Sequence, residues 1–258
     1  MNNTKPAYFI SDAHLGIACP GYEAREQHLA EFLGSLHGRA DSLFIVGDLF
    51  DFWVEYAHAI RPVYFSILHH FKSLIDAGTS VHYLAGNHDF ALGPCLRDAI
   101  GMNLYTDHLT ITMQGKKLHL HHGDGLIRQE VGYRFLRFVL RNKVNQTLYK
   151  MLHPDIGVAL AMFFSGGSRH FFRKKCSEKR KQQYRSLARK YLAGGDDIVI
   201  FAHTHSPELH NWDGKWFCNT GEWIRRYIYA KLDDGTISLW QHFPNKAAQP
   251  LAPAEESK

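Results

Sequence analysis

Two pairs of potential metal ligands stand near opposite ends of the chain, and each pair follows a short apolar run. Asp12 and His14 follow AYFIS, and His203 and His205 follow IVIFA. Residues two apart project to the same side of an extended chain, so each pair presents two side chains together. Carboxylates and imidazoles are the side chains that bind divalent transition metals in proteins. The spacing therefore indicates metal chemistry.

Three more polar clusters, GDLFD, GNHD and HGD, follow the apolar runs LFIV, VHYLA and KLHLH. The ligands of open α/β sheets bind at the carboxyl ends of the strands, so we expect all five clusters to converge there. The converging ligand set is Asp12, His14, Asp48, Asn87, His122, His203 and His205.

Seven ligands are too many for one tetrahedral zinc, and they suit two divalent ions that share an aspartate. A bridging carboxylate holds two metals about 3.5–4 Å apart, an arrangement that activates water for attack on phosphoesters. Gly47, Gly86 and Gly123 let the backbone pass close to the ions. Each cluster alone could be a turn, a loop or a pair of surface histidines. All five in the same position after a strand favour the metal interpretation.

The elements that must position these clusters alternate in the first third of the chain. Apolar, β-rich runs occupy residues 7–11, 43–47 and 81–85, and residues 23–37 and 62–77 lie between them. Both intervening segments place their large apolar residues at helical intervals. The residues so spaced are Leu29, Phe32, Leu33, Leu36, Tyr64, Ile67, Leu68, Phe71 and Leu74. Strand–helix–strand alternation predicts parallel strands with right-handed crossovers.

After residue 105 the strands become closely spaced. Apolar runs occupy residues 109–113, 117–121, 198–202 and 216–240. The sequences GKK and DDG, which come between neighbouring strands, are typical of hairpin turns. We therefore predict an α/β fold in which two sheets pack together with helices outside.

A basic segment interrupts this body at about residues 126–193. It contains 16 Lys and Arg against three acidic residues, a local net charge of +13 in a chain of +5. An apolar stripe runs along its predicted helices at Tyr133, Leu136, Leu140, Val144, Leu148 and Met151. The stripe could pack on the body, and the charge could bind nucleic acid. Because the segment lacks aromatic–basic interleaving and the body is acidic, we do not expect nucleic acid as a partner.

Composition indicates a globular protein of 258 residues, with 45% hydrophobic and 21% charged residues. No apolar run approaches the roughly 20 residues that cross a bilayer, and the N-terminus lacks a signal pattern. The four cysteines are scattered, which favours a reduced cytoplasmic chain. We predict one domain over residues 1–245, interrupted by the insertion, and a mobile tail at 246–258.

The ordered set DAH, GDLFD, GNHD, HGD and HTH resembles the calcineurin-like metallophosphoesterases over almost the whole chain. The resemblance implies an αββα sandwich and two divalent ions, Mn²⁺ first, with Fe or Zn as alternatives. It implies that the first ion is held by Asp12, His14, Asp48 and His205. The second would be held by Asp48, Asn87, His122 and His203, with Asp48 bridging. The glycine usual before HTH is Ala202 here.

The same resemblance implies that His88 faces the phosphate as a proton donor or charge stabiliser. It also implies that Asp89 orients His88, which is how a catalytic imidazole is tuned.

A narrower resemblance lies in GDLFDFW, GNHDF-x-LG and HGDGL followed by E-x-GY. These motifs resemble the UDP-2,3-diacylglucosamine pyrophosphatases of lipid A synthesis, which release UMP and an acylated sugar phosphate. The resemblance implies a lipid-linked nucleotide sugar as substrate, an insertion that takes the acyl chains, and peripheral binding to the cytoplasmic membrane face. The substrate contacts it implies are Asn87, His88, Glu130 and His203. The studied branch has arginine in place of His88 and aspartate in place of Glu130.

Three other functions fit the sequence less well. A general phosphodiesterase acting on another small phosphoester is the first alternative. A nuclease would use the same metals with the basic segment. A non-catalytic scaffold of this fold would be expected to lose metal ligands, and all seven are present here.

Overall fold

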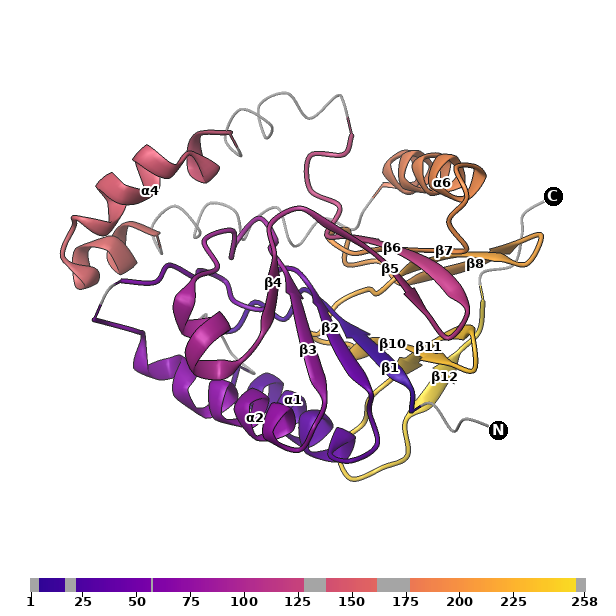
Figure 1. Ribbon diagram of the computed structural model, residues 1–258, viewed down its shortest axis with the longest axis horizontal. Helices are drawn as coiled ribbons and strands as arrows, with labels where there is room; N and C mark the ends of the chain where they lie inside the picture. The colour runs from indigo at the N-terminus through magenta and orange to yellow at the C-terminus, as the bar shows by residue number, and fades with distance from the viewer. Residues whose placement is uncertain (1–4, 17–21, 57, 128–137, 162–176, 254–258) are drawn as a thin grey trace.

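Two β-sheets lie face to face, and helices cover their outer faces (Figure 1). The computed structural model describes residues 5–16, 22–56, 58–127, 138–161 and 177–253. The layers follow the order helix, sheet, sheet, helix, so the predicted α/β class and αββα sandwich are confirmed.

The first sheet has seven strands in the order β12-β11-β10-β1-β2-β3-β4. Strands β1 to β4 are parallel, as the alternation of strands and helices predicted, and β10 to β12 add antiparallel strands at the other side. The strand bounds are β1 Ala7–Ile10, β2 Ser42–Val46, β3 Ser80–Leu84, β4 Asn103–Tyr105, β10 Ile228–Asp233, β11 Thr236–Gln241 and β12 Gln249–Leu251. Strand β4 was not predicted, since three residues are too few to show a period.

The second sheet has five strands in the order β5-β6-β7-β9-β8. Strands β6, β7 and β9 are parallel, so the ends of β6 and β7 point the same way. The strand bounds are β5 His108–Met113, β6 Lys116–His121, β7 Ile198–Phe201, β8 Glu208–Trp212 and β9 Lys215–Asn219. Both predicted hairpin turns are present: Gln114–Gly115 and Asp234–Gly235 adopt positive φ at both central residues, as tight hairpins require.

A hydrophobic core fills the space between the sheets. Phe9 and Phe44 stack there with ring centroids 4.9 Å apart, and Val46, Leu120 and Ile200 are fully buried in the same cluster. This core fixes how the strand ends of one sheet face those of the other.

Helices α1 (Tyr22–Leu36) and α2 (Phe65–Asp76) cover the outer face of the first sheet. Every apolar residue that the helical spacing selected in these two segments is buried. A 3₁₀ turn, η1 (Pro62–Tyr64), precedes α2, and a short π-helix, η2 (Cys95–Ile100), packs beside it.

Among the helices that the structure describes in the predicted insertion, two have different surroundings. Helix α6 (Glu178–Ala193) covers the outer face of the second sheet, where Tyr184, Ala188 and Leu192 are buried. Helix α4 (Lys143–Lys150) has no buried residue and stands away from both sheets in Figure 1. Thus α6 forms the second helical layer of the sandwich, and α4 lies outside the layers.

The predicted tail needs a correction. Strand β12, within it, pairs antiparallel with β11, so residues 249–251 are part of the first sheet. Their sequence, QPL, is too short and polar to be read as a strand without its partner.

Among the described helices, none is both long and apolar enough to span a bilayer.

Candidate metal centre

All seven predicted ligands lie in the loops that follow five parallel strands. Strands β1, β2 and β3 deliver the ligands of the first sheet, and β6 and β7 deliver those of the second. The face-to-face packing brings these loops together, so the side chains form one cluster.

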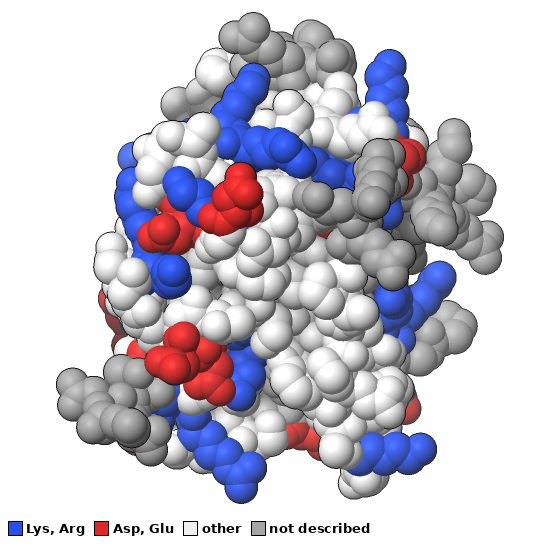
Figure 2. Space-filling view, turned by 90° about the vertical axis from the view of Figure 1, so that its right-hand side faces the viewer, with Lys and Arg blue, Asp and Glu red and all other residues white. Residues whose placement is uncertain are grey.

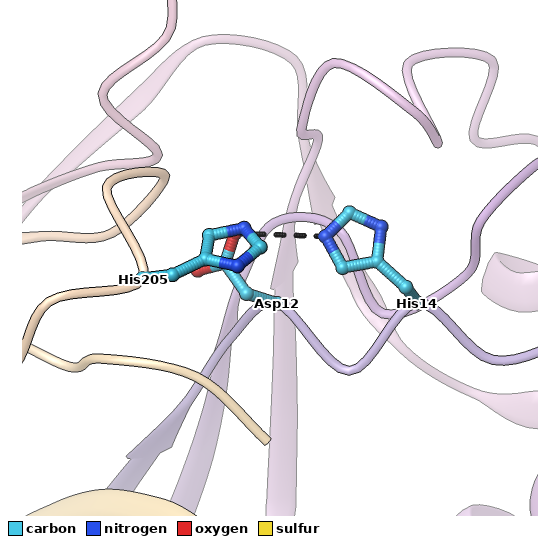
Figure 3. A group of neighbouring side chains, drawn as sticks. All are labelled: Asp12, His14 and His205. Atoms are coloured by element: carbon cyan, nitrogen blue, oxygen red, sulfur yellow. Dashed lines mark ion pairs between the residues drawn. The ribbon is translucent and has the colours of Figure 1, made fainter. Parts of the chain in front are cut away.

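The first part of the cluster consists of Asp12, His14 and His205 (Figure 3). Nε2 of His205 lies 3.2 Å from Asp12 Oδ1, and Nε2 of His14 lies 3.9 Å from the same oxygen. The other carboxylate oxygen accepts hydrogen bonds from Ser11 Oγ at 2.6 Å and from the His203 amide at 3.2 Å. One oxygen of Asp12 is therefore held by the protein while the other faces two imidazoles.

The second part consists of Asp48, His122 and His203, with Asn87 beside them. Nε2 of His122 lies 3.3 Å from Asp48 Oδ2 and 3.1 Å from Asn87 Oδ1. Ligands around one cation at about 2.1 Å lie about 3 Å apart when they meet at a right angle. These spacings fit a shared ion.

Asp48 lies between the two parts. Its Oδ2 is 3.8 Å from His14 Nε2 in the first part and 3.3 Å from His122 Nε2 in the second. Its Oδ1 accepts a hydrogen bond from the His88 amide at 2.9 Å. A single carboxylate thus faces both sets of imidazoles, which is the arrangement of a bridging ligand.

The backbone supplies an independent test of fit. Asp12, His14, Asp48, His203 and His205 all adopt positive φ, between 44° and 65°. Left-handed backbone costs a non-glycine residue roughly 1–2 kcal/mol, and such strain gathers at functional sites. Five of the seven candidate ligands adopt this strained backbone. The fold therefore places these side chains in the cluster against the usual preference of non-glycine residues for negative φ.

Two glycines make room for the cluster. A Cβ on Gly47 would lie 2.3 Å from the His122 ring, and a Cβ on Gly86 would lie 2.1 Å from Asp48 Oδ1. Neither position accepts a side chain without moving a ligand.

The tautomer of His122 also fits a metal. Its Nδ1 donates to the Val46 carbonyl at 2.8 Å, which leaves Nε2 to face Asp48 and Asn87. Ligating histidines commonly donate their second ring nitrogen to a backbone carbonyl in this way.

The charges of the centre call for a cation. Burial opposes ionisation of Asp48, but His122 and His88 outweigh it and hold the pKa of this carboxyl well below its usual value. Burial likewise lowers the pKa of His122, yet Asp48 raises it to about 10. Burial lowers the pKa of His203 to about 3, with His122 adding to the effect. The low pKa of Asp48 keeps this carboxylate anionic, which is the state in which it binds a metal ion. The donor set fits divalent metals.

His88 lies at the rim of the cluster. Its Nδ1 donates to the backbone carbonyl of Asp51 at 2.9 Å, and its ring meets that of His14 edge to face at 4.7 Å. The Asp51 carboxylate is also near, with Oδ1 3.6 Å from His88 Nδ1 and 3.8 Å from His14 Nδ1. Asp51 thus orients both rings.

The role expected of Asp89 needs a correction. Its Oδ1 accepts from the amides of Asp48 and Gly86, and its Oδ2 accepts from the Phe50 amide and the Tyr83 hydroxyl. Both oxygens accept hydrogen bonds from the loops after β2 and β3 or from Tyr83 of β3, so Asp89 positions the loop that carries Asp48. We expected Asp89 to orient His88 because the two residues are adjacent in the sequence.

Two arginines of the insertion reach the centre and were not predicted. Nη2 of Arg180 donates to His203 Nε2 at 3.3 Å. Nη2 of Arg141 donates to the Gly86 carbonyl at 3.2 Å and lies 3.6 Å from an Asp124 oxygen. Both belong to an insertion with many basic residues. Their contact partners lie 23 and 55 positions away in the sequence, so no local spacing could predict these contacts. Glu130 lies outside the described residues.

Comparisons with known proteins agree with this geometry. The family model for the calcineurin-like phosphoesterases matches residues 5–207. The UDP-2,3-diacylglucosamine hydrolase of Porphyromonas gingivalis is 30% identical over 255 residues, covering 90% of this chain and 95% of that protein. The hydrolase of the same name from Neisseria meningitidis serogroup B is 32% identical over 232 residues, with the same coverage. That of Pseudomonas putida is 31% identical over 237 residues, covering 89% and 96%.

Proposed function

Because the chain belongs to the calcineurin-like phosphoesterase family and is a hydrolase, we propose that it hydrolyses UDP-2,3-diacylglucosamine. Water would add to the uridine-side phosphorus, the bond to the bridging oxygen would break, and the products would be UMP and 2,3-diacylglucosamine 1-phosphate. The names of the relatives support this substrate.

The proposed metal ligands are the seven residues of the cluster. One divalent ion would be held by Asp12, His14, Asp48 and His205, and the other by Asp48, Asn87, His122 and His203. When bound, two such ions polarise the phosphoryl group and lower the pKa of water. Mn²⁺ is the proposed ion, since imidazole with carboxylate and amide oxygen suits it.

His88 would act on the phosphate. The Asp51 carbonyl fixes Nδ1 as the protonated nitrogen, so Nε2 is left for the substrate. We propose that a protonated Nε2 donates to a phosphate oxygen or to the departing sugar phosphate. Asn87 and His203 would also contact the substrate, as would Glu130.

Arg141 and Arg180 would hold the diphosphate. Both guanidinium groups enter from the insertion and end beside the loops that carry Asn87 and His203. Arginine presents a planar fork of donors that matches phosphate oxygens. The insertion would therefore supply the charge that binds the anionic part of the substrate.

The observation that carries the proposed substrate is an apolar groove beside His88. A groove of about 460 Å³ lies between residues 52–56 and 59–64 on one side and the helical residues 154–159 on the other. Its lining includes Phe52, Trp53, Ile60, Val158 and Ala159. Phe52 directly follows Asp51, and the amide of Trp53 donates to the His88 carbonyl at 3.4 Å, so the groove begins next to the residue that orients His88.

A second apolar surface lies on α4 and Met151, and α4 meets the groove through Tyr149, whose ring centroid is 5.9 Å from that of Phe52. Val144, Leu148 and Met151 are exposed by 65%, 58% and 78% of their surface. Water rejects an acyl chain at about 0.8 kcal/mol per buried methylene, so lipid chains would gain by contact with these side chains. The same surface, with the basic residues of the insertion, would favour peripheral binding to an anionic membrane.

Product analysis in ¹⁸O-water tests the proposal. Purified protein with Mn²⁺ and UDP-2,3-diacylglucosamine should release UMP that carries the label, and the sugar phosphate should carry none. Label in the sugar phosphate would overturn the assigned point of attack.

A general phosphodiesterase acting on a small phosphoester is the second candidate, because the metal cluster by itself selects no leaving group. Turnover of a chromogenic diester without any turnover of the acylated UDP-sugar would favour it.

A further inference from the structure

A second cluster of metal-ligand side chains lies outside the strand-end centre. It joins His28 and Glu31 of α1 to His242, the residue that follows β11. Each residue offers one ligand atom, and the three atoms lie within 4.8 Å of one another. None of the three belongs to the sequence motifs, and the proposed reaction does not use them.

Both histidines have a ring nitrogen that lacks a partner among the described residues. His28 Nδ1 and His242 Nε2 are shielded from solvent and make no hydrogen bond. A buried polar nitrogen left in this state costs roughly 1–3 kcal/mol. The Glu31 carboxylate accepts one hydrogen bond, from Gln27 at 2.9 Å, through Oε1.

The surrounding structure holds the two rings in place. The His28 ring packs against Tyr227 with centroids 4.2 Å apart, and the His242 ring stacks on Trp223 at 5.7 Å and 23°. The His242 amide donates to the Tyr227 carbonyl at 2.9 Å, although Tyr227 adopts a φ of 50°. A ligand set with fixed rings loses little conformational entropy when an ion binds.

We infer that His28, Glu31 and His242 form a zinc site distinct from the catalytic centre. Two imidazoles and one carboxylate are ligands that Zn²⁺ accepts in tetrahedral geometry, with the fourth position left to water. All three residues are partly exposed, so the cluster lies near the surface of the protein.

The ion would join α1 to the end of β11, the strand next to the edge strand β12 of the first sheet. Helix α1 contacts the centre through Arg25, whose Nη1 donates to the carbonyls of Ala13 and His14 at 3.1 and 3.0 Å. From the other side, the Trp223 amide donates to the Asp12 carbonyl at 3.2 Å. The site therefore lies between α1, which contacts the loop of Asp12 and His14 through Arg25, and His242, whose ring stacks on Trp223. Its role is structural.

Counting zinc tests the inference. Protein stripped with a chelator is given excess Zn²⁺, desalted, and assayed for zinc per chain by mass spectrometry. The parent should hold about three ions, two in the centre and one here, and His28→Gln and His242→Gln should hold about two. His37→Gln is the matched control, because His37 is exposed just beyond the end of α1; it should match the parent.

Glu31→Gln guards against a folding artefact, since it keeps the side chain's shape and should still weaken zinc. Hydrolysis of a small chromogenic diester in excess Mn²⁺ should stay at the parent rate in all three variants. An unchanged zinc count would overturn the inference. If a variant loses both zinc and diester hydrolysis, the missing ion belongs to the catalytic centre, and the inference is overturned as well.

Discussion

The strand-end centre and helix α4 are built in opposite ways. In the centre, Asp12, Asp48 and His122 are almost fully buried, and each is held by several hydrogen bonds or by strained backbone. On α4, Val144 and Leu148 are exposed by more than half, and no residue of the helix is buried. Rigid placement is what metal chemistry requires, whereas an exposed apolar surface is what a flexible lipid chain requires.

Helix α6 shows that exposure of apolar residues is not a property of the whole basic insertion. It belongs to the same basic insertion as α4, yet it buries Tyr184, Ala188 and Leu192 and forms an ion pair with the second sheet. Figure 2 looks onto the side that carries α6, where Lys and Arg side chains gather along the upper part. Within the described part of the insertion, α6 thus completes the sandwich and α4 lies outside it. The variants below test whether the metal centre, α4 and α6 have these separate roles.

The largest effect is expected from Asp48→Ala. Asp48 faces both sets of imidazoles, so its loss should disturb both ions and lower hydrolysis of every phosphoester by at least about 10³-fold. The measurement is turnover of both the acylated UDP-sugar and a chromogenic diester with Mn²⁺ in excess. Mn²⁺ should also raise the melting temperature of the parent more than that of the variant.

Asp98→Ala is the control for Asp48→Ala, because it removes a carboxylate that is 61% exposed and pairs only with Arg97 among its described contacts. It should leave both activities unchanged. Near-parental turnover by Asp48→Ala would rule out the two-metal centre.

The second effect concerns His88. Its replacement by alanine should lower kcat by about 10²–10⁴-fold on both substrates, the usual contribution of a positioned acid, and should leave the metal content unchanged. His88→Arg separates two roles, since arginine binds phosphate but does not release a proton. Full activity in the arginine variant would show that His88 binds charge and donates no proton.

The third effect separates the two regions directly. Val144→Glu with Leu148→Glu places two charges on the apolar surface of α4, so the acyl chains should bind worse. We expect KM for the acylated UDP-sugar to rise by at least about tenfold, while the chromogenic diester keeps its kcat/KM. Steady-state kinetics on both substrates is the measurement.

The matched control adds the same two charges elsewhere on α4. Asn145→Glu with Thr147→Glu alters exposed polar positions of the same helix, and it should change neither substrate's kinetics. If both double variants impair the lipid substrate equally, added charge and not the apolar surface would be the cause.

The sequence predicted the centre better than it predicted the insertion, for a physical reason. Each ligand stands directly after an apolar strand, and parallel strands deliver their ends to one edge, so Asp12, Asp48 and His122 were placed by local pattern together with a general rule of sheets. The calcineurin-like family and the αββα fold that the motifs implied are confirmed.

Contacts that depend on packing between distant segments were beyond the sequence. The helical period showed apolar faces on both α4 and α6, but a period does not say whether a partner covers the face. The real partner of His88, Asp51, lies 37 positions away, and the partners of Asp89 lie on two loops. Neighbours in sequence were a poor guide to neighbours in space at these positions.

The smallest effect tests whether α6 belongs to the body. Glu208 of β8 accepts two hydrogen bonds from Arg185 of α6, at 2.8 and 3.1 Å, and lies 3.3 Å from Lys181 Nζ. Glu208→Gln removes this charge and should lower the free energy of unfolding by about 1–3 kcal/mol at pH 7. Thermal or denaturant unfolding measures it, and diester hydrolysis should not change.

The pH dependence of that loss has a definite sign. Burial raises the pKa of Glu208, but hydrogen bonds from His210 and Arg185 outweigh it and lower it to about 2 from 4.5. A depressed pKa means stability that is present above the unfolded value of 4.5 and is lost as pH falls toward 2. The difference in the free energy of unfolding between parent and variant should therefore be largest near pH 7, and it should shrink as the pH falls from 4.5 to 2.

Glu178→Gln is the matched control, since Glu178 pairs with the same arginine but is 60% exposed and should contribute little. Equal losses in both variants would mean that α6 is held no more firmly at Glu208 than at its surface, and α6 would then resemble α4.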